Sequence, residues 1–157
     1  MKKLISIINT IAVVAALILV YPEISMSQTP APQDLTQDEV KRLSDSADAF
    51  KSIAKVSELP GGLNKTFGEM ADPGKPFNSG CVRTPDLPSQ SLKFAAATSD
   101  RLWISYQSGG FCLMNKLELH EISDNKNKLL WSTITPQPMA SIKDISEFLK
   151  KTNSKKN

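Results

Sequence analysis

His120, the only histidine of the chain, follows Glu118 by two residues in a segment where apolar residues alternate. Side chains two apart on a β-strand point to the same face, so an imidazole and a carboxylate would lie side by side there. Such a pair could perform acid–base chemistry or contribute to a metal site. A single histidine is a weak cluster for either purpose and is more typical of a surface position near the end of a strand. We therefore keep His120 and Glu118 only as weak acid–base candidates and expect no catalytic residue and no metal site.

Other catalytic and cofactor signatures are missing from the sequence. It has no G-x-S-x-G elbow and no C-x-x-C pair, and Gly61-Gly62 is not followed by the Lys-Ser/Thr of a phosphate-binding loop. A nucleophilic Cys112 acting with His120 would require a free thiol. The formal net charge of +3 over 157 residues is too small to suggest a nucleic-acid partner. We expect no cofactor and no nucleic-acid binding.

The two cysteines, Cys81 and Cys112, form the next candidate pair. In an exported chain, two cysteines predict a disulfide bond. Two free thiols or a metal site are the alternatives, although two cysteines and one histidine fall short of the four ligands of a structural zinc. We expect the bond to hold the proline-rich residues 72–88 against the sheet near Gly109-Gly110.

Export is predicted by the N-terminus. Lys2-Lys3 precedes an apolar run over residues 4–20, and Ser25-Met26-Ser27 offers small residues at the positions that signal peptidase reads. Residues 1–27 are thus predicted to be a signal peptide, and 28–35 a flexible leader. The alternative is an uncleaved membrane anchor, because the run is just about long enough to span a bilayer. Cleavage would remove two lysines and one glutamate, which lowers the net charge from +3 to +2.

Residues 92–135 contain four segments with the period-two alternation or the composition of β-strands. The predicted strands are residues 92–96, 102–106, 111–120 and 129–134. Turn-forming residues separate them at 98–100, at Gly109-Gly110 and at 124–128. Strands joined by short turns pair side by side, so we predict a four-stranded antiparallel meander.

The register of the central hairpin decides which side chains share a face. A two-residue Gly109-Gly110 turn places Leu117 opposite Leu102, Lys116 opposite Trp103 and Glu118 opposite Arg101. A turn one residue earlier would bring Lys116 against Arg101, which disfavours it. The preferred register predicts an apolar face that consists of Leu92, Phe94, Ala96, Leu102, Ile104, Tyr106, Phe111, Leu113, Leu117 and Leu119. It predicts a mixed face with Cys112, Glu118 and His120, on which Trp103, Met114 and Lys116 form a possible contact patch.

Helical patterns flank the sheet. Thr36 and Glu39 form a capping box, and an apolar stripe predicts a helix over residues 36–59, before Pro60-Gly61-Gly62. Ser141 and Asp144 form a second capping box for a short C-terminal helix that ends near Lys151. We therefore predict a single α+β domain over residues 36–151, with the N-terminal helix packed on the meander. Residues 152–157 are predicted to be a disordered basic tail.

These observations favour a small exported binding module, such as an inhibitor, immunity or adaptor protein in the periplasm or outside the cell. Its partner would be another protein of the envelope or extracellular space. Two alternatives stay open: a small secreted enzyme that uses His120 with a carboxylate, and a membrane-anchored accessory subunit that keeps residues 4–20. Membrane contact is expected only in the last case.

Overall fold

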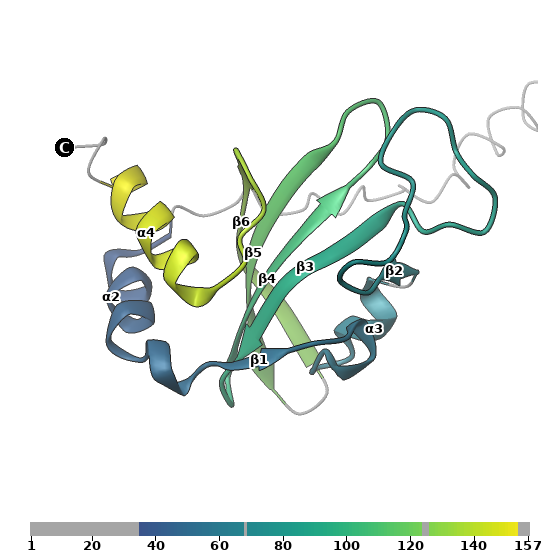
Figure 1. Ribbon diagram of the computed structural model, residues 1–157. Coiled ribbons are helices and arrows are strands. Elements are labelled where there is room, and N and C mark those ends of the chain that lie inside the picture. The colour runs from purple at the N-terminus through teal and green to yellow at the C-terminus, as the bar shows by residue number, and fades with distance from the viewer. Residues whose placement is uncertain (1–34, 68, 124–125, 154–157) are drawn as a thin grey trace, which may run out of the picture. The chain divides into compact units, whose positions relative to one another are not determined.

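A twisted, mainly antiparallel sheet forms the centre of the part of the chain that the structure describes (Figure 1). The structure is a computed structural model, and it describes residues 35–67, 69–123 and 126–153. The strands are β1 (Lys51–Ile53), β2 (Met70–Ala71), β3 (Gln90–Ala97), β4 (Arg101–Ser108), β5 (Met114–Ser123) and β6 (Lys126–Thr135). Strands β1-β3-β4-β5-β6 pair antiparallel in that order, and β2 pairs parallel to β3. The predicted α+β class and antiparallel sheet are confirmed, but the sheet has six strands and not four.

The β4–β5 hairpin has a different register from the predicted one. Ser108 pairs with Met114 and Arg101 with Glu121, so residues 109–113 form the loop and the pairing is shifted by three residues. The prediction of a two-residue turn was wrong because Gly109 is explained by packing and not by turn geometry. Of the two glycines, only Gly110 has a positive φ, whereas a Cβ on Gly109 would collide with the carbonyl oxygen of Asn78. Gly109 is needed for the close approach of another chain segment and not for a primed turn.

A shift by an odd number of residues exchanges the two faces of β5 relative to β4. Leu117 and Leu119 therefore share a face with Trp103, while Glu118 and His120 share a face with Leu102, Ile104 and Tyr106. Each face carries its own core. The first consists of Val56, Leu59, Leu63, Met70, Leu92, Ala95, Leu102, Ile104 and Tyr106. The second consists of Val40, Leu43, Trp103, Leu117, Leu119, Met139, Ile145 and Leu149.

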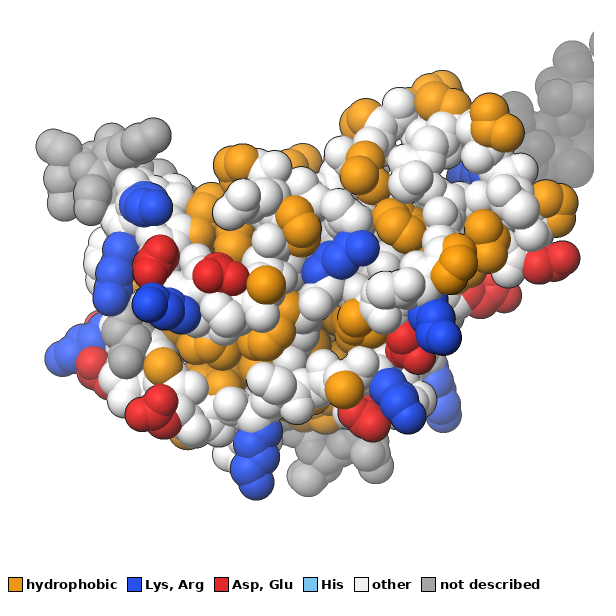
Figure 2. All heavy atoms as spheres, in the orientation of Figure 1, with side chains coloured by type: hydrophobic (Ala, Val, Ile, Leu, Met, Phe, Trp, Pro, Cys, Tyr) orange, Lys and Arg blue, Asp and Glu red, His pale blue; other side chains and the backbone are white. Residues whose placement is uncertain are grey.

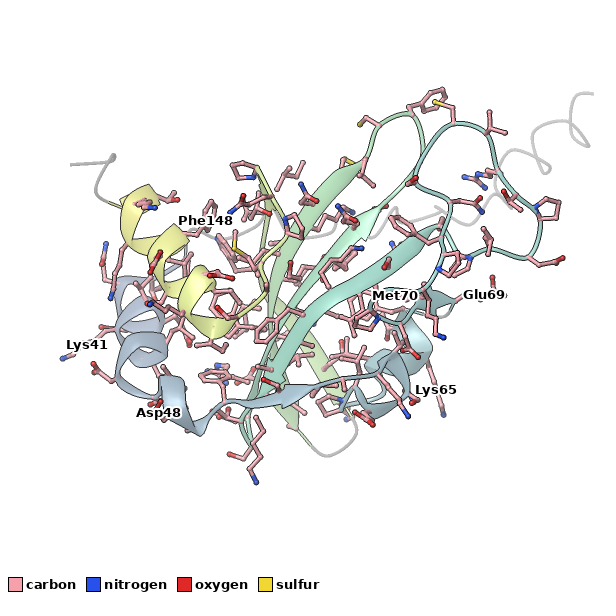
Figure 3. All side chains as sticks on the ribbon, in the orientation of Figure 1. Lys41, Asp48, Lys65, Glu69, Met70 and Phe148 are labelled. Carbon is pink, nitrogen blue, oxygen red and sulfur yellow. The ribbon has the colours of Figure 1, made fainter. Side chains whose placement is uncertain are left out.

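The helices divide between these faces. The second core is covered by α2 (Gln37–Asp45) and α4 (Ile142–Asn153), and the first by the short helices η2 (Val56–Glu58) and α3 (Leu63–Thr66). Figure 3 shows Phe148 of α4 on one side of the sheet and Met70 of β2 on the other. The prediction of one helix over residues 36–59 was wrong: after α2 come η1 (Ala47–Ala49) and the edge strand β1. A continuous helix on one face could not deliver Phe50 to the second core and Ile53 to the first.

Both predicted helix starts are confirmed. The hydroxyl of Thr36 accepts a hydrogen bond from the backbone N–H of Glu39 at 3.3 Å. Ser141 Oγ accepts one from the N–H of Asp144 at 3.1 Å. These side chains satisfy backbone donors that the first turn of a helix leaves unpaired.

Residues 72–89 form a long loop beside the β4–β5 turn, and a buried asparagine organises it. Asn78 donates from Nδ2 to the carbonyl oxygens of Thr84 and Leu87, and its Oδ1 accepts from the N–H of Thr84. The N–H of Gly109 donates to the carbonyl oxygen of Ser89 at 2.9 Å. The loop is thus fixed by amide hydrogen bonds and by the close contact at Gly109.

Several sequence predictions fall outside the described residues, namely the signal peptide over 1–27, residues 28–34 of the leader and residues 154–157 of the tail. Helix α4 continues to Asn153, two residues beyond its predicted end near Lys151. Among the described residues, no helix combines the length and apolarity needed to cross a membrane.

Candidate functional site

A buried polar network lies on the sheet face under α3. Tyr106 Oη donates a hydrogen bond of 2.7 Å to Oε1 of Glu118, whose Oε2 lies 2.9 Å from Nε2 of His120. Strand β4 supplies the tyrosine, and β5 supplies the other two residues two positions apart, which confirms that Glu118 and His120 share a face. The ring of Phe67 packs edge-on against both Tyr106 and His120, with ring centroids 5.4 and 6.1 Å away.

The electrostatics of this network favour an ionised Glu118. Burial alone would raise the pKa of its carboxyl group, but hydrogen bonds from His120 and Tyr106 and the charges of His120 and Lys116 hold that pKa below its usual value. Burial and the neighbouring Glu118 raise the pKa of Tyr106. The carboxylate is therefore the acceptor of both hydrogen bonds.

The network is closed to solvent in this arrangement. The side chain of His120 is 5 % exposed and that of Glu118 12 %, and Nδ1 of His120 is buried without a hydrogen-bond partner among the described residues. The prediction of a surface position for His120 was wrong because the three-residue register shift turns it onto the covered face. A general base must come within hydrogen-bond distance of its substrate, and this geometry instead suits a role in packing and register.

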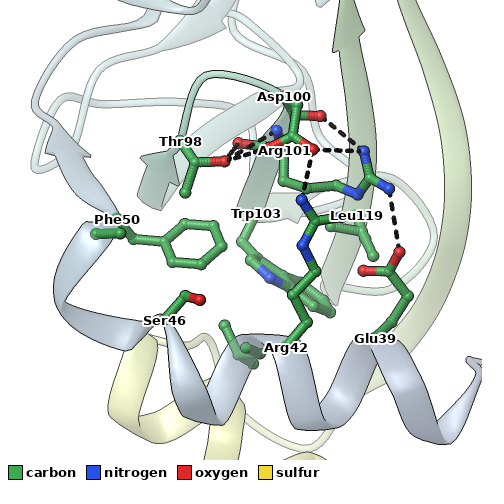
Figure 4. A pocket seen from close by; sticks show the side chains of 11 residues that line it. Glu39, Arg42, Ser46, Phe50, Thr98, Asp100, Arg101, Trp103 and Leu119 are labelled. Atoms are coloured by element: carbon green, nitrogen blue, oxygen red, sulfur yellow. Dashed lines mark hydrogen bonds and ion pairs between the residues drawn. The ribbon is translucent and has the colours of Figure 1, made fainter.

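A second polar cluster surrounds Arg101 at the other end of β4 (Figure 4). The guanidinium of Arg101 pairs with Glu39 at 3.2 Å and with Asp100 and Glu121 at 3.3 Å. Arg42 of α2 pairs with Asp100 at 2.7 Å. Burial would raise the pKa of Asp100, but hydrogen bonds from Thr98 and Arg42 and the charges of both arginines lower it. These ion pairs attach α2 to the β3–β4 turn.

Beside the Arg101 cluster lies a cavity of about 110 Å³. Its apolar wall includes Phe50, Trp103 and Leu119 (Figure 4). Sites for drug-sized ligands have volumes of about 300–1,000 Å³. This cavity holds a few waters at most, and its arginines already have carboxylate partners.

Phe111 and Val82, the two most exposed large apolar side chains among the described residues, lie on two neighbouring loops. Phe111 has a relative exposure of 101 % and Leu113 of 47 % on the β4–β5 loop, and Val82 is 89 % exposed on the 72–89 loop. The two loops touch where Sγ of Cys81 lies 3.5 Å from the carbonyl oxygen of Phe111. Figure 2 shows hydrophobic side chains gathered over this part of the molecule. We call Val82, Phe111 and Leu113 the loop tip.

Cys81 and Cys112 both lie at the loop tip as exposed, free cysteines. The predicted disulfide bond is therefore not present in the structure. The loop is instead held by the hydrogen bonds of Asn78 and by its contact with Gly109, so its position does not require a bond between the sulfurs. Within the described residues no group of three or more His, Cys, Asp or Glu side chains is arranged to hold a metal ion.

The predicted contact patch is not assembled in the structure. Trp103 is 1 % exposed, because the register places it under α2 and α4, where it meets Trp131 with ring centroids 5.9 Å apart. Met114 is half-buried where β5 begins. Lys116 lies opposite Tyr106 and not opposite Trp103, with Nζ 5.7 Å from the Tyr106 ring centroid.

Sequence reasoning missed Tyr106, Asn78 and the exposure of Phe111. The sequence did contain a signal for Tyr106. In any register that pairs even-numbered residues of β4 with even-numbered residues of β5, Tyr106 lies on the same face as Glu118 and His120. Phe111 and Leu113 continue the alternation of β5, so nothing in their types marks them as loop residues.

No protein-family model matches this chain, and neither does any curated protein or solved structure.

Proposed function

We propose that the protein is an exported binding module that contacts a protein partner of the envelope or extracellular space through the loop tip. The observation that carries the proposal is the complete exposure of Phe111, on the same loop as Leu113, where this loop touches the one that carries the exposed Val82. Single exposed apolar residues are ordinary on protein surfaces, but a cluster of them marks a contact site. Aromatic anchors that enter a partner's pocket often dominate binding energy.

The anchoring of the two loops supports this proposal. The contact of Gly109 with Asn78 and the hydrogen bond from Gly109 to Ser89 fix the loops against each other at their bases. A surface that is already ordered loses less conformational entropy when it binds. The exposed side chains are thus presented by loops that contact each other at their bases.

A photo-cross-linking experiment tests the proposal in cells that naturally make the protein. A photoreactive phenylalanine analogue replaces Phe111, and a control chain carries it at Thr66, an exposed position on α3. We expect position 111 to capture one defined protein partner that position 66 does not capture. Equal products from both positions would overturn the proposal.

Competition with unlabelled variants sharpens the result. We expect Phe111→Asp to lose about 30-fold in affinity, corresponding to about 2 kcal/mol for an aromatic anchor, whereas Thr66→Asp competes like wild type. Deleting residues 111–113 should also abolish competition, because it leaves Gly109-Gly110 as a two-residue turn between the paired Ser108 and Met114. Undiminished competition by both tip variants would contradict the proposed surface.

A further inference from the structure

Strand β6 leaves one edge of the sheet open. It is ten residues long and pairs with β5 on one side, and no described strand pairs with its other side. Backbone-to-backbone hydrogen bonds from β6 to described loops or helices are likewise absent. An unpaired edge presents a row of N–H and C=O groups that can accept another strand.

The usual protection against strand addition covers only one end of β6. Lys126 and Lys128 lie at its start, and lysines on an edge discourage pairing. From Leu129 to Thr135 the strand has no charged residue and no proline. The unprotected stretch also carries two exposed large apolar side chains, Leu129 at 39 % and Ile134 at 63 %.

An irregularity in β6 places these two side chains on one face. The pairing with β5 shifts between Leu119 and His120, where Trp131 pairs with Leu119 but Leu129 with His120, so Leu130 is an extra residue. Leu129 therefore lies on the face of His120, and Ile134 lies on the same face opposite Lys116. Without the extra residue, side chains five positions apart would point to opposite faces.

The two apolar residues are arranged for self-pairing. In an antiparallel pair of two β6 strands centred on Ser132, Trp131 lies opposite Thr133 of the other copy, and Ile134 lies opposite the bulged Leu129–Leu130. Side chains that lie opposite each other in this pair point to the same face of the joined sheet. Each exposed Ile134 is therefore covered by Leu129 of the other copy. Lys128 lies opposite Thr135, so no lysine opposes another lysine. A parallel pair would align the lysines of the two copies, which repel each other.

We propose that β6 is the interface of a symmetric dimer, in which two copies of this chain pair antiparallel through their β6 edges about a two-fold axis at Ser132. The contact is isologous, since each surface serves both copies. The sheets of the two copies join into one. The interface consists of β6 and uses no residue of the loop tip, so it can be tested separately from the proposed binding function.

Cysteine cross-linking at the axis tests this geometry in the full chain. Ser132→Cys is made in a background with Cys81→Ser and Cys112→Ser, and Lys126→Cys in the same background is the control. Directly opposite residues have Cβ atoms about 5 Å apart, whereas the two copies of residue 126 would lie about 40 Å apart, about twelve strand residues from each other. We expect mild oxidation to give a covalent dimer from Ser132→Cys and none from Lys126→Cys. The opposite pattern, or no dimer from either, would overturn the proposal.

Sedimentation analysis over a range of concentrations supplies a second measurement. We expect wild type to shift from monomer to dimer as its concentration rises, and Ile134→Lys to weaken this association at least tenfold. Ile134 is 63 % exposed but lies opposite Lys116, so near-ultraviolet circular dichroism checks that the added lysine leaves the fold intact. Thr66→Lys controls for the added charge and Phe111→Asp for the loop tip, and both should dimerise like wild type. Wild type that stays monomeric up to millimolar concentration, or an Ile134→Lys variant that dimerises normally, would contradict the interface.

Discussion

Removing the hydroxyl of Tyr106 is the sharpest test of the buried network. Tyr106→Phe keeps the ring, which is packed against Phe67, and deletes the 2.7 Å hydrogen bond to Oε1 of Glu118. Hydrogen bonds to charged groups contribute about 1.5–3 kcal/mol. Because the Glu118 side chain is only 12 % exposed, water cannot fully replace the lost donor. We expect a loss of about 2 kcal/mol of unfolding free energy at neutral pH.

The loss should also depend on pH in a defined direction. The Tyr106 hydroxyl helps to hold the pKa of Glu118 below its usual 4.5. A lowered folded-state pKa stabilises the fold fully above the unfolded-state pKa, and this stabilisation disappears as the pH falls through the folded-state pKa. The difference between wild type and Tyr106→Phe should therefore be complete above pH 4.5 and shrink at lower pH.

Urea unfolding followed by tryptophan fluorescence at several pH values measures both effects. A loss of about 2 kcal/mol lowers the midpoint by about 1 M for a typical slope. Ser132→Ala is the matched control, since Ser132 faces Glu118 across β5 and β6 but makes no hydrogen bond through its side chain to a described residue. A cost below about 0.5 kcal/mol at neutral pH, or a cost that grows on acidification, would refute the assigned role of the network.

Two further predictions concern the loops. Gly109→Ala places a Cβ against the backbone oxygen of Asn78, so it should destabilise the fold by about 1–3 kcal/mol and speed proteolysis within residues 72–89. Gly80→Ala, whose Cβ meets nothing within 4 Å, should change neither, and equal effects of the two would contradict the packing. Both exposed thiols, Cys81 and Cys112, should react with a maleimide in the folded protein before any reduction. Labelling of neither until a reductant is added would show instead that they form the bond predicted from the sequence.

The strands of the sheet could be predicted because their signals are local. Period-two alternation and turn residues located β3 to β6, and two capping boxes located the starts of α2 and α4. The short strands β1 and β2 could not be found this way. Each exists only because β3 offers it a partner, and neither has enough residues to show a period.

The site was predicted less well because it depends on register. Opposite charges across the hairpin supported the predicted pairing of Arg101 with Glu118, but the true pairing of Arg101 with Glu121 satisfies the same criterion. Local charge matching therefore could not distinguish the two registers. The deciding contact, Asn78 against Gly109, joins residues that are far apart in the chain and leaves no pattern in the sequence.

The register of one hairpin thus determines both candidate sites at once. Extending the β4–β5 loop to residues 109–113 removes Phe111 and Leu113 from the sheet and exposes them beside Val82. Because the shift is an odd number of residues, it also moves His120 and Glu118 from the predicted mixed face to the face covered by α3. The residues that resembled an acid–base pair become a buried support for the sheet, and residues that resembled strand core become the exposed surface. If the loop tip binds a partner, the Tyr106–Glu118–His120 network contributes indirectly, because its hydrogen bonds favour the register that exposes the tip.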